Sequence, residues 1–169
     1  LRAFKNSLEK IDDNIKLIFI GSGAQELILK NYVTVNNLEN RVVFTGKIID
    51  LNKLKTYYKR AIISVSYGQA GLSVLQSLGY GVPFLTKKNA ITGGEITNIV
   101  NNYNGFLCED NLDSLEKHIV QIVSDKELLK RMGENAFNYY TNYCTIENMV
   151  QGVFDIIDKT RLTRIDKRF

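Results

Sequence analysis

The 169-residue sequence predicts an α/β protein with a doubly wound parallel sheet and additional C-terminal helices. Short apolar segments alternate with amphipathic helical segments, which is the pattern of parallel strands joined by crossover helices. The apolar segments are continuous, as in residues 16–20, and continuous apolarity is typical of strands buried on both faces. After residue 110 the pattern is helical throughout. We therefore expect one Rossmann-like domain over residues 1–169.

Five strands are expected, in residues 16–20, 41–45, 61–66, 84–86 and 105–108. Helical segments are expected in residues 1–9, 24–36, 51–59, 72–80, 96–100, 112–124, 126–142 and 146–162. Apolar side chains spaced by three or four residues should face the sheet. These side chains include Leu27, Ile28, Tyr32, Leu51, Leu54, Tyr58, Leu72, Leu75 and Leu78. Asp125 and Thr145 precede the last two helices and are expected to cap them.

Composition excludes several classes of protein. No apolar run reaches the ~18 residues of a membrane-spanning helix, and no signal peptide is visible. Cys108, Cys144 and the single histidine, His118, lack metal-binding spacing, so we expect no metal site. We expect reduced thiols in a cytoplasmic protein. Because the sequence begins without Met inside a helical pattern, we also expect it to be a piece of a longer chain.

The net charge of +4 is concentrated at the C-terminal end. Residues 158–169 contain five Lys or Arg and two Asp, which together contribute +3. Such a segment is either a solvated helix end or a peripheral contact with anionic lipid at the inner membrane face. Nucleic acid is not an expected partner, because aromatic side chains for base stacking do not alternate with these charges.

The central segment is the Gly-rich loop Tyr67-Gly68-Gln69-Ala70-Gly71, between the third strand and the helix that follows it. Parallel α/β sheets bind ligands at the carboxyl ends of their strands, where this loop lies. Glycine lets the backbone approach an anion closely, and a helix start favours negative charge. The loop is therefore either a phosphate cradle or a simple strand-to-helix turn.

Four polar side chains near this loop are further candidates. Gln76 lies one turn into the helix, and helical side chains tilt toward the N-terminus, so its amide could reach sugar hydroxyls. Gly93-Gly94-Glu95 could place backbone N–H groups and one carboxylate against a hydroxylated ligand, or Glu95 could only favour the helix dipole. Lys87 and Lys88 could neutralise phosphate or remain solvated.

Two other loops belong to the same edge. Gly21-Ser22-Gly23 follows the first strand, but Glu26 occupies the place of the third glycine of a dinucleotide fingerprint. A tight turn beside a ligand is therefore preferred, and an NAD-dependent oxidoreductase is a lesser alternative. Gly46-Lys47-Ile48 ends the second strand, where its backbone could read a nucleobase edge or form a simple turn.

The order of these motifs resembles the C-terminal, donor-binding domain of GT-B glycosyltransferases of the large retaining family four, also called glycosyl transferases group 1. The motifs are in residues 17–23, 40–46, 66–83, 93–95 and 104–107. The resemblance implies one half of a GT-B fold and a nucleotide-diphosphate sugar as donor. It also implies transfer with retention of configuration and no metal or other cofactor.

The resemblance implies a place for each part of the donor. The diphosphate would lie at Gly71 and Leu72, the base near residues 46–48, and the ribose near Gln76. Glu95 is the candidate catalytic residue, although the Pro that the family often has before it is Gly94 here. The residues expected to bind the donor are Gly21, Gly23, Gly46, Lys47, Ile48, Gly68, Gln69, Gly71, Leu72, Gln76, Lys87, Gly94 and Glu95.

Two departures from the family pattern affect the functional prediction. The usual pair of glutamates separated by seven residues is replaced by Gly68 and Gln76. The chain better resembles a branch of the family that has His or Gln at the second position, followed by a segment like residues 80–83. This resemblance implies a role in bacterial surface polysaccharide or lipopolysaccharide synthesis. The acceptor-binding N-terminal domain is not in the sequence, so this piece alone is expected not to transfer sugar. The alternative is a non-catalytic nucleotide-sugar-binding scaffold module.

Overall fold

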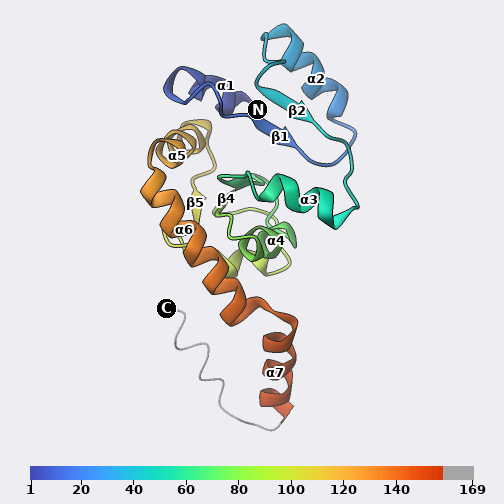
Figure 1. Ribbon diagram of the computed structural model, residues 1–169, viewed down its shortest axis with the longest axis vertical. Helices are drawn as coiled ribbons and strands as arrows, with labels where there is room; N and C mark the ends of the chain where they lie inside the picture. The colour runs from blue at the N-terminus through green and yellow to red at the C-terminus, as the bar shows by residue number, and fades with distance from the viewer. Residues whose placement is uncertain (158–169) are drawn as a thin grey trace.

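The computed structural model describes residues 1–157 and shows the predicted alternation of strands and helices (Figure 1). The five strands are β1 (Leu17–Phe19), β2 (Val42–Phe44), β3 (Ser64–Val65), β4 (Phe84–Lys87) and β5 (Gly105–Cys108). All three pairs of neighbouring strands are parallel, so the α/β class with parallel pairing is confirmed. The predicted basic segment, residues 158–169, lies outside the described residues.

The strands form two sheets instead of the single sheet that we predicted. One sheet has the order β1-β2 and the other β3-β4-β5. No ladder between the two sheets is present in residues 1–157, because β3 is only two residues long and pairs with β4 alone. Figure 1 shows β1 and β2 with α1 and α2 in one half of the molecule and β4, β5 and α4 in the other.

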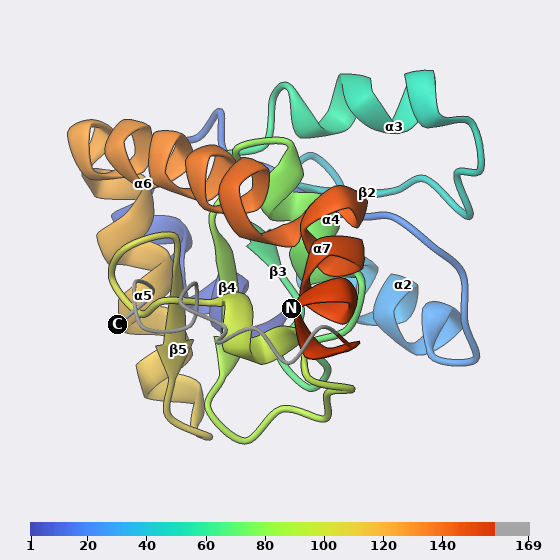
Figure 2. The ribbon, with the colours of Figure 1, turned by 90° about the horizontal axis from the view of Figure 1, so that it is seen from below.

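Helices connect and cover the strands. They are α1 (Arg2–Ser7), α2 (Glu26–Val35), α3 (Leu51–Tyr58), α4 (Ser73–Gly79), α5 (Leu112–Ser124), α6 (Lys126–Tyr139) and α7 (Ile146–Ile157). Short helical turns cover Leu8–Lys10, Glu95–Asn98 and Tyr140–Cys144, and the last of these ends α6 before the predicted boundary. Seen from below, α5 and α6 lie on the β5 side, while α2 and α3 lie on the other side (Figure 2).

The expected caps are present at the last two described helices. The Asp125 carboxylate accepts a hydrogen bond from the Leu128 N–H at 2.8 Å, and the Thr145 hydroxyl accepts one from the Asn148 N–H at 3.3 Å. Each cap satisfies a backbone donor that a helix start would otherwise leave unpaired. The start positions of α6 and α7 therefore follow directly from local sequence.

The half with three strands holds a closely packed core. Its fully buried side chains come from α4, β4, β5, α5 and α6 and are Val74, Leu78, Phe84, Leu85, Phe106, Ile122, Met132 and Ala136. The prediction that Leu72 faces the core is wrong, since this side chain is 76% exposed. The helix begins at Ser73, so Leu72 lies outside its first turn, and Val74 and Ser77 take the inward positions.

The half with two strands is less completely covered. Phe4, Val33 and Val42 are buried in its core, but Leu27 and Ile28 are 70% and 61% exposed. We predicted both as inward residues, and that prediction is wrong because they lie in the first turn of α2, where a sheet of two strands offers no surface to cover them. Further apolar side chains that we expected to be buried are exposed. They are Ile18, Ile20, Val43 and Val65 in and beside the strands and Leu51 in α3.

Candidate functional site

The first two loops of the predicted edge meet directly. The Gly21 N–H donates a hydrogen bond to the Gly46 carbonyl at 2.9 Å, although the two residues follow different strands. Gly21 has φ of +132° and Gly46 has φ of +67°, so both positions favour glycine. The turn interpretation of both motifs is therefore supported by the backbone. Gly23 and Lys47 are exposed beside this contact, and Ile48 is half-buried.

The Gly-rich loop is held by the loop after β4. The Ile91 N–H donates to the Gly68 carbonyl at 3.0 Å, and the Ala70 N–H donates to the Ile91 carbonyl at 2.8 Å. Ala70 is fully buried, while Gly68 and Gln69 are exposed. A Cβ atom at Gly68 or Gly71 would meet nothing within 4 Å, so open space faces both glycines. The loop thus has a fixed backbone and room for a ligand beside it.

Gln76 points to a neighbour that the sequence did not suggest. The Tyr58 hydroxyl in α3 donates to the Gln76 Oε1 atom at 3.5 Å, and the Tyr58 ring stacks on Tyr80 with centroids 4.6 Å apart. Burial raises the pKa of Tyr58, so the hydroxyl remains a neutral donor. Gln76 itself is exposed. The Tyr58 hydroxyl therefore holds the Gln76 amide on the side of α4 that faces α3.

Glu95 is tied to its own loop. Its Oε2 atom accepts hydrogen bonds from the Gly93 N–H at 2.9 Å and from the Thr92 hydroxyl at 3.3 Å. Hydrogen bonds from its own backbone N–H, from Gly93 and from Thr92 hold the pKa of Glu95 below its ordinary value. Gly94 beside it has φ of +123°. An ionised Glu95 can stabilise positive charge or orient a ligand, and it cannot act as a general acid near neutral pH.

Lys87, the last residue of β4, and Lys88, which follows it, are both paired with acidic residues after β5. The Lys87 Nζ atom lies 2.9 Å from Asp110 Oδ2, and Lys88 pairs with Glu109. The hydrogen bond from Lys87 is the main reason why the pKa of Asp110 lies below its usual range. Sequence reasoning missed this cluster. The acidic pair directly after the fifth strand was the available signal, since parallel strands bring their carboxyl ends to one edge.

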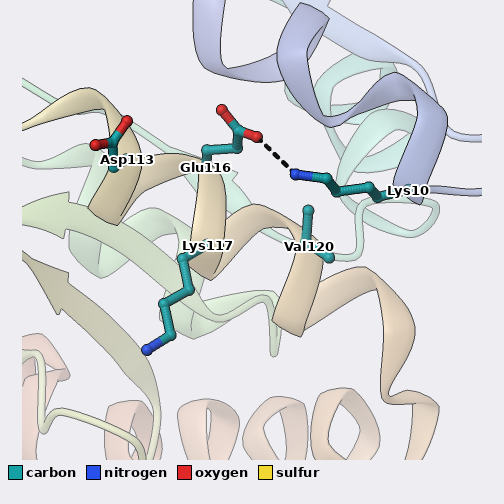
Figure 3. A pocket seen from close by; sticks show the side chains of 5 residues that line it. All are labelled: Lys10, Asp113, Glu116, Lys117 and Val120. Atoms are coloured by element: carbon teal, nitrogen blue, oxygen red, sulfur yellow. Dashed lines mark hydrogen bonds and ion pairs between the residues drawn. The ribbon is translucent and has the colours of Figure 1, made fainter.

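A shallow hollow of about 390 Å³ lies elsewhere, between α5 and the turn at Leu8–Lys10 (Figure 3). It is lined by Lys10, Asp113, Glu116, Lys117 and Val120. The Lys10 ammonium lies 3.0 Å from Glu116 Oε1, so part of the polar lining is internally satisfied. None of the predicted donor-binding residues lines this hollow.

Residues 1–157 contain neither a metal-ligating cluster nor a membrane-spanning helix. This part of the chain has no group of three or more His, Cys, Asp or Glu side chains placed to hold a metal ion. Its helices include none that is both long enough and apolar enough to cross a bilayer.

A sequence model of the family described as "Glycosyl transferases group 1" matches residues 1–139. The chain belongs to this family. The family assignment confirms the resemblance stated above, and it gives no support to the oxidoreductase alternative at residues 21–23.

Relatives of this glycosyltransferase family member are found across domains of life. It is 26% identical over 137 residues to the N-acetyl-alpha-D-glucosaminyl L-malate synthase of Bacillus anthracis, covering 80% of this chain and 35% of that protein. It is 29% identical over 144 residues to an uncharacterised glycosyltransferase of Methanocaldococcus jannaschii, covering 82% of this chain and 36% of that protein. The sequence thus spans about a third of the length of these relatives.

Solved structures confirm the Rossmann-like GT-B fold. The C-terminal domain of a glycosyl transferase group 1 family protein (LpcC) from Francisella tularensis superposes with a TM-score of 0.72 at 22% identity. That match covers 85% of this chain and 76% of the other. HepE of Anabaena, solved in complex with UDP, gives a TM-score of 0.72 at 18% identity and covers 94% of this chain and 44% of that chain.

Proposed function

We propose that this chain is the nucleotide-sugar-binding part of a retaining glycosyltransferase. The observation that carries the proposal is the open space beside Gly71, at the start of α4 in a chain of this family. HepE, which shares the fold, was solved with UDP, and this supports a nucleotide diphosphate as the ligand class. The role in bacterial surface polysaccharide synthesis is part of the proposal and rests on the resemblance of residues 80–83.

The proposed chemistry needs stabilisation of the negative charge that develops on the leaving diphosphate. Gly71 and Leu72 would present backbone to the phosphates, and the joined loops at Gly21 and Gly46 would border the base. Gln76 would offer a neutral amide to the ribose in place of the usual carboxylate. We further propose that donor binding requires no metal ion, so that chelation leaves the affinity unchanged.

Calorimetry with UDP, GDP and ADP tests donor binding. Gly71→Val should abolish binding because a β-branched side chain would fill the space into which the anion must come. The substitution should leave the fold intact, since a Cβ atom at Gly71 meets nothing within 4 Å and φ is not in the left-handed region.

Gly152→Val in α7 is the matched control, because a Cβ atom there also meets nothing within 4 Å. This control should bind as tightly as the unchanged chain. Equal UDP affinity in the Gly71→Val variant would show that the Gly-rich loop is only a turn.

The scaffold alternative is favoured by one observation, the absence of carboxylates at Gly68 and Gln76. Both proposals predict nucleotide binding, so binding cannot separate them. Donor hydrolysis or transfer by the full-length protein, measured with a panel of nucleotide sugars and lipid-linked acceptors, does separate them. Failure to turn over any donor, despite nucleotide binding, would establish the scaffold.

We also propose that the protein works in the cytoplasm and contacts the inner membrane face through residues 158–169. The support is the +3 charge of that segment and the exposed apolar residues of the helix before it, among them Met149, Val153 and Phe154. Sedimentation should show binding to phosphatidylglycerol vesicles that weakens with salt, and none to phosphatidylcholine vesicles. Equal behaviour with both lipids would contradict this contact.

A further inference from the structure

A polar cluster joins the loops after β4 and β5 and lies outside the predicted donor-binding set except for Lys87. Its centre is Asp110, whose Oδ2 atom lies 2.9 Å from Lys87 Nζ and 3.4 Å from Asn89 Nδ2. Beside this contact Lys88 pairs with Glu109. Two cations therefore face two carboxylates across the two loops, and the cluster is locally neutral.

The same cluster contacts Tyr67, the first residue of the Gly-rich loop. The Tyr67 hydroxyl lies 3.3 Å from Asp110 Oδ1 and 3.3 Å from the carbonyls of Glu109 and Asn111, so its single hydrogen is shared among them. The Lys87 ammonium also lies 5.7 Å from the Tyr67 ring centroid, within range of a cation–π contact. Asp110 thus faces Tyr67 and Lys87 together.

The opposite end of the β4 loop is bonded to the Gly-rich loop. Ile91 makes backbone hydrogen bonds to Gly68 and Ala70, at 3.0 and 2.8 Å. Ala90 is buried in the same apolar cluster as Ala70, so the two loops also share a hydrophobic anchor. Residues 87–91 therefore connect the ion pairs at one end to the Gly-rich loop at the other.

We propose that Asp110 is a positioning residue that holds the Gly-rich loop in its donor-binding geometry through Tyr67 and through residues 87–91. This inference rests on the proposed function, because the loop is assumed to bind the donor. Asp110 needs no contact with the donor itself. Its lowered pKa agrees with an ionised carboxylate held by Lys87 and hydrogen-bonded by Asn89 and Tyr67.

Amide hydrogen exchange of the chain without nucleotide tests the link directly. Asp110→Asn should speed exchange at the Ala70 and Ile91 amides about threefold, as expected from losing exposed ion pairs. Asp113→Asn removes the same charge from an exposed site three residues away and should change neither amide. Asp110→Glu retains the charge and should restore most of the protection. In the unchanged chain, high salt should reproduce the effect of Asp110→Asn, because salt screens ion pairs.

UDP affinity is then measured by calorimetry on the same variants, and Asp110→Asn should weaken it about threefold, in step with the exchange rates. Unchanged exchange in Asp110→Asn, an equal rise in Asp113→Asn, or no response to salt would overturn the positioning role. If the unchanged chain bound none of UDP, GDP and ADP, the proposed function would fail, while the exchange rates would still decide whether Asp110 holds the loop.

Discussion

The two halves of the molecule differ in how completely their strands are covered. In the half with three strands, Leu78, Phe84 and Leu85 are fully buried between helices on either side. In the half with two strands, Ile18 and Val43 are 41% and 37% exposed although they lie in paired strands. Similar apolar segments thus have different environments, because α4, α5 and α6 pack against β4 and β5 while β1 and β2 are covered less completely.

The difference also divides the candidate site. The Gly-rich loop, Glu95 and Lys87 belong to the well-covered half, where each is fixed by several hydrogen bonds. The loops at Gly21 and Gly46 belong to the other half and are joined by one backbone hydrogen bond. We therefore expect the part of the site proposed for phosphate to be more rigid than the part proposed for the base.

The largest effect is expected for a backbone contact in the well-covered half. A Cβ atom at Gly105 would lie 2.4 Å from the Phe84 carbonyl oxygen and 2.9 Å from Ile99 Cγ2. Gly105→Ala should lower the free energy of unfolding by on the order of 4 kcal/mol, because neither the strand nor its neighbour can move away. Urea denaturation measures the change.

Gly23→Ala in the other half is the control for this substitution, since its Cβ atom would meet nothing within 4 Å. It should change the free energy of unfolding by less than about 0.5 kcal/mol. An equal loss of unfolding free energy in the two variants would contradict this explanation. It would show that position 105 does not require glycine because of its close approach to β4.

The same leucine truncation in both halves should give unequal losses. Leu78→Ala removes a fully buried side chain and should cost about 3 kcal/mol, the sum of lost transfer energy and a cavity. Leu27→Ala removes a side chain that is 70% exposed and should cost less than about 0.5 kcal/mol. Thermal or urea unfolding of the two variants checks the ratio. A comparable loss for Leu27→Ala would show that α2 is covered in solution.

The strands and helices and their succession along the chain could be predicted from sequence because they depend on local patterns. Segments 105–108 and 112–124 match the observed elements residue for residue, and the cap at Asp125 marks the start of α6. Burial could not be predicted as well, since it depends on which elements become neighbours and on where each helix begins. Leu27 and Leu72 have helical spacing like that of Leu78, yet both are exposed.

The candidate site shows the same division. The glycines could be located because chain turns need them, and positive φ at Gly21, Gly46 and Gly94 agrees with that reasoning. The partners of the polar side chains could not be located. Tyr58 lies 18 residues before Gln76, and single-sequence spacing carries no signal for that pair. Asp110 lies 23 residues after Lys87, and the only signal for this pair was that both residues stand at the carboxyl ends of parallel strands.

The smallest effect is expected at Tyr58, which lies in the helix that connects the two halves. Burial raises the pKa of Tyr58, and a hydrogen bond with Ser64 only partly opposes the shift. A raised pKa means that its contribution to stability is complete below about pH 10 and is lost as the pH rises through the folded-state value. Thermal unfolding at increasing alkaline pH should therefore show that Tm falls as the pH rises. In the Tyr58→Phe variant this fall in Tm should be smaller, by no more than about 2 °C.

Tyr57→Phe, one residue earlier in α3, is the control and should leave the fall in Tm unchanged. If both variants behaved alike, the packing of Tyr58 on Tyr80 would not restrain ionisation, and α3 would be attached to α4 more loosely than the 4.6 Å ring stacking indicates.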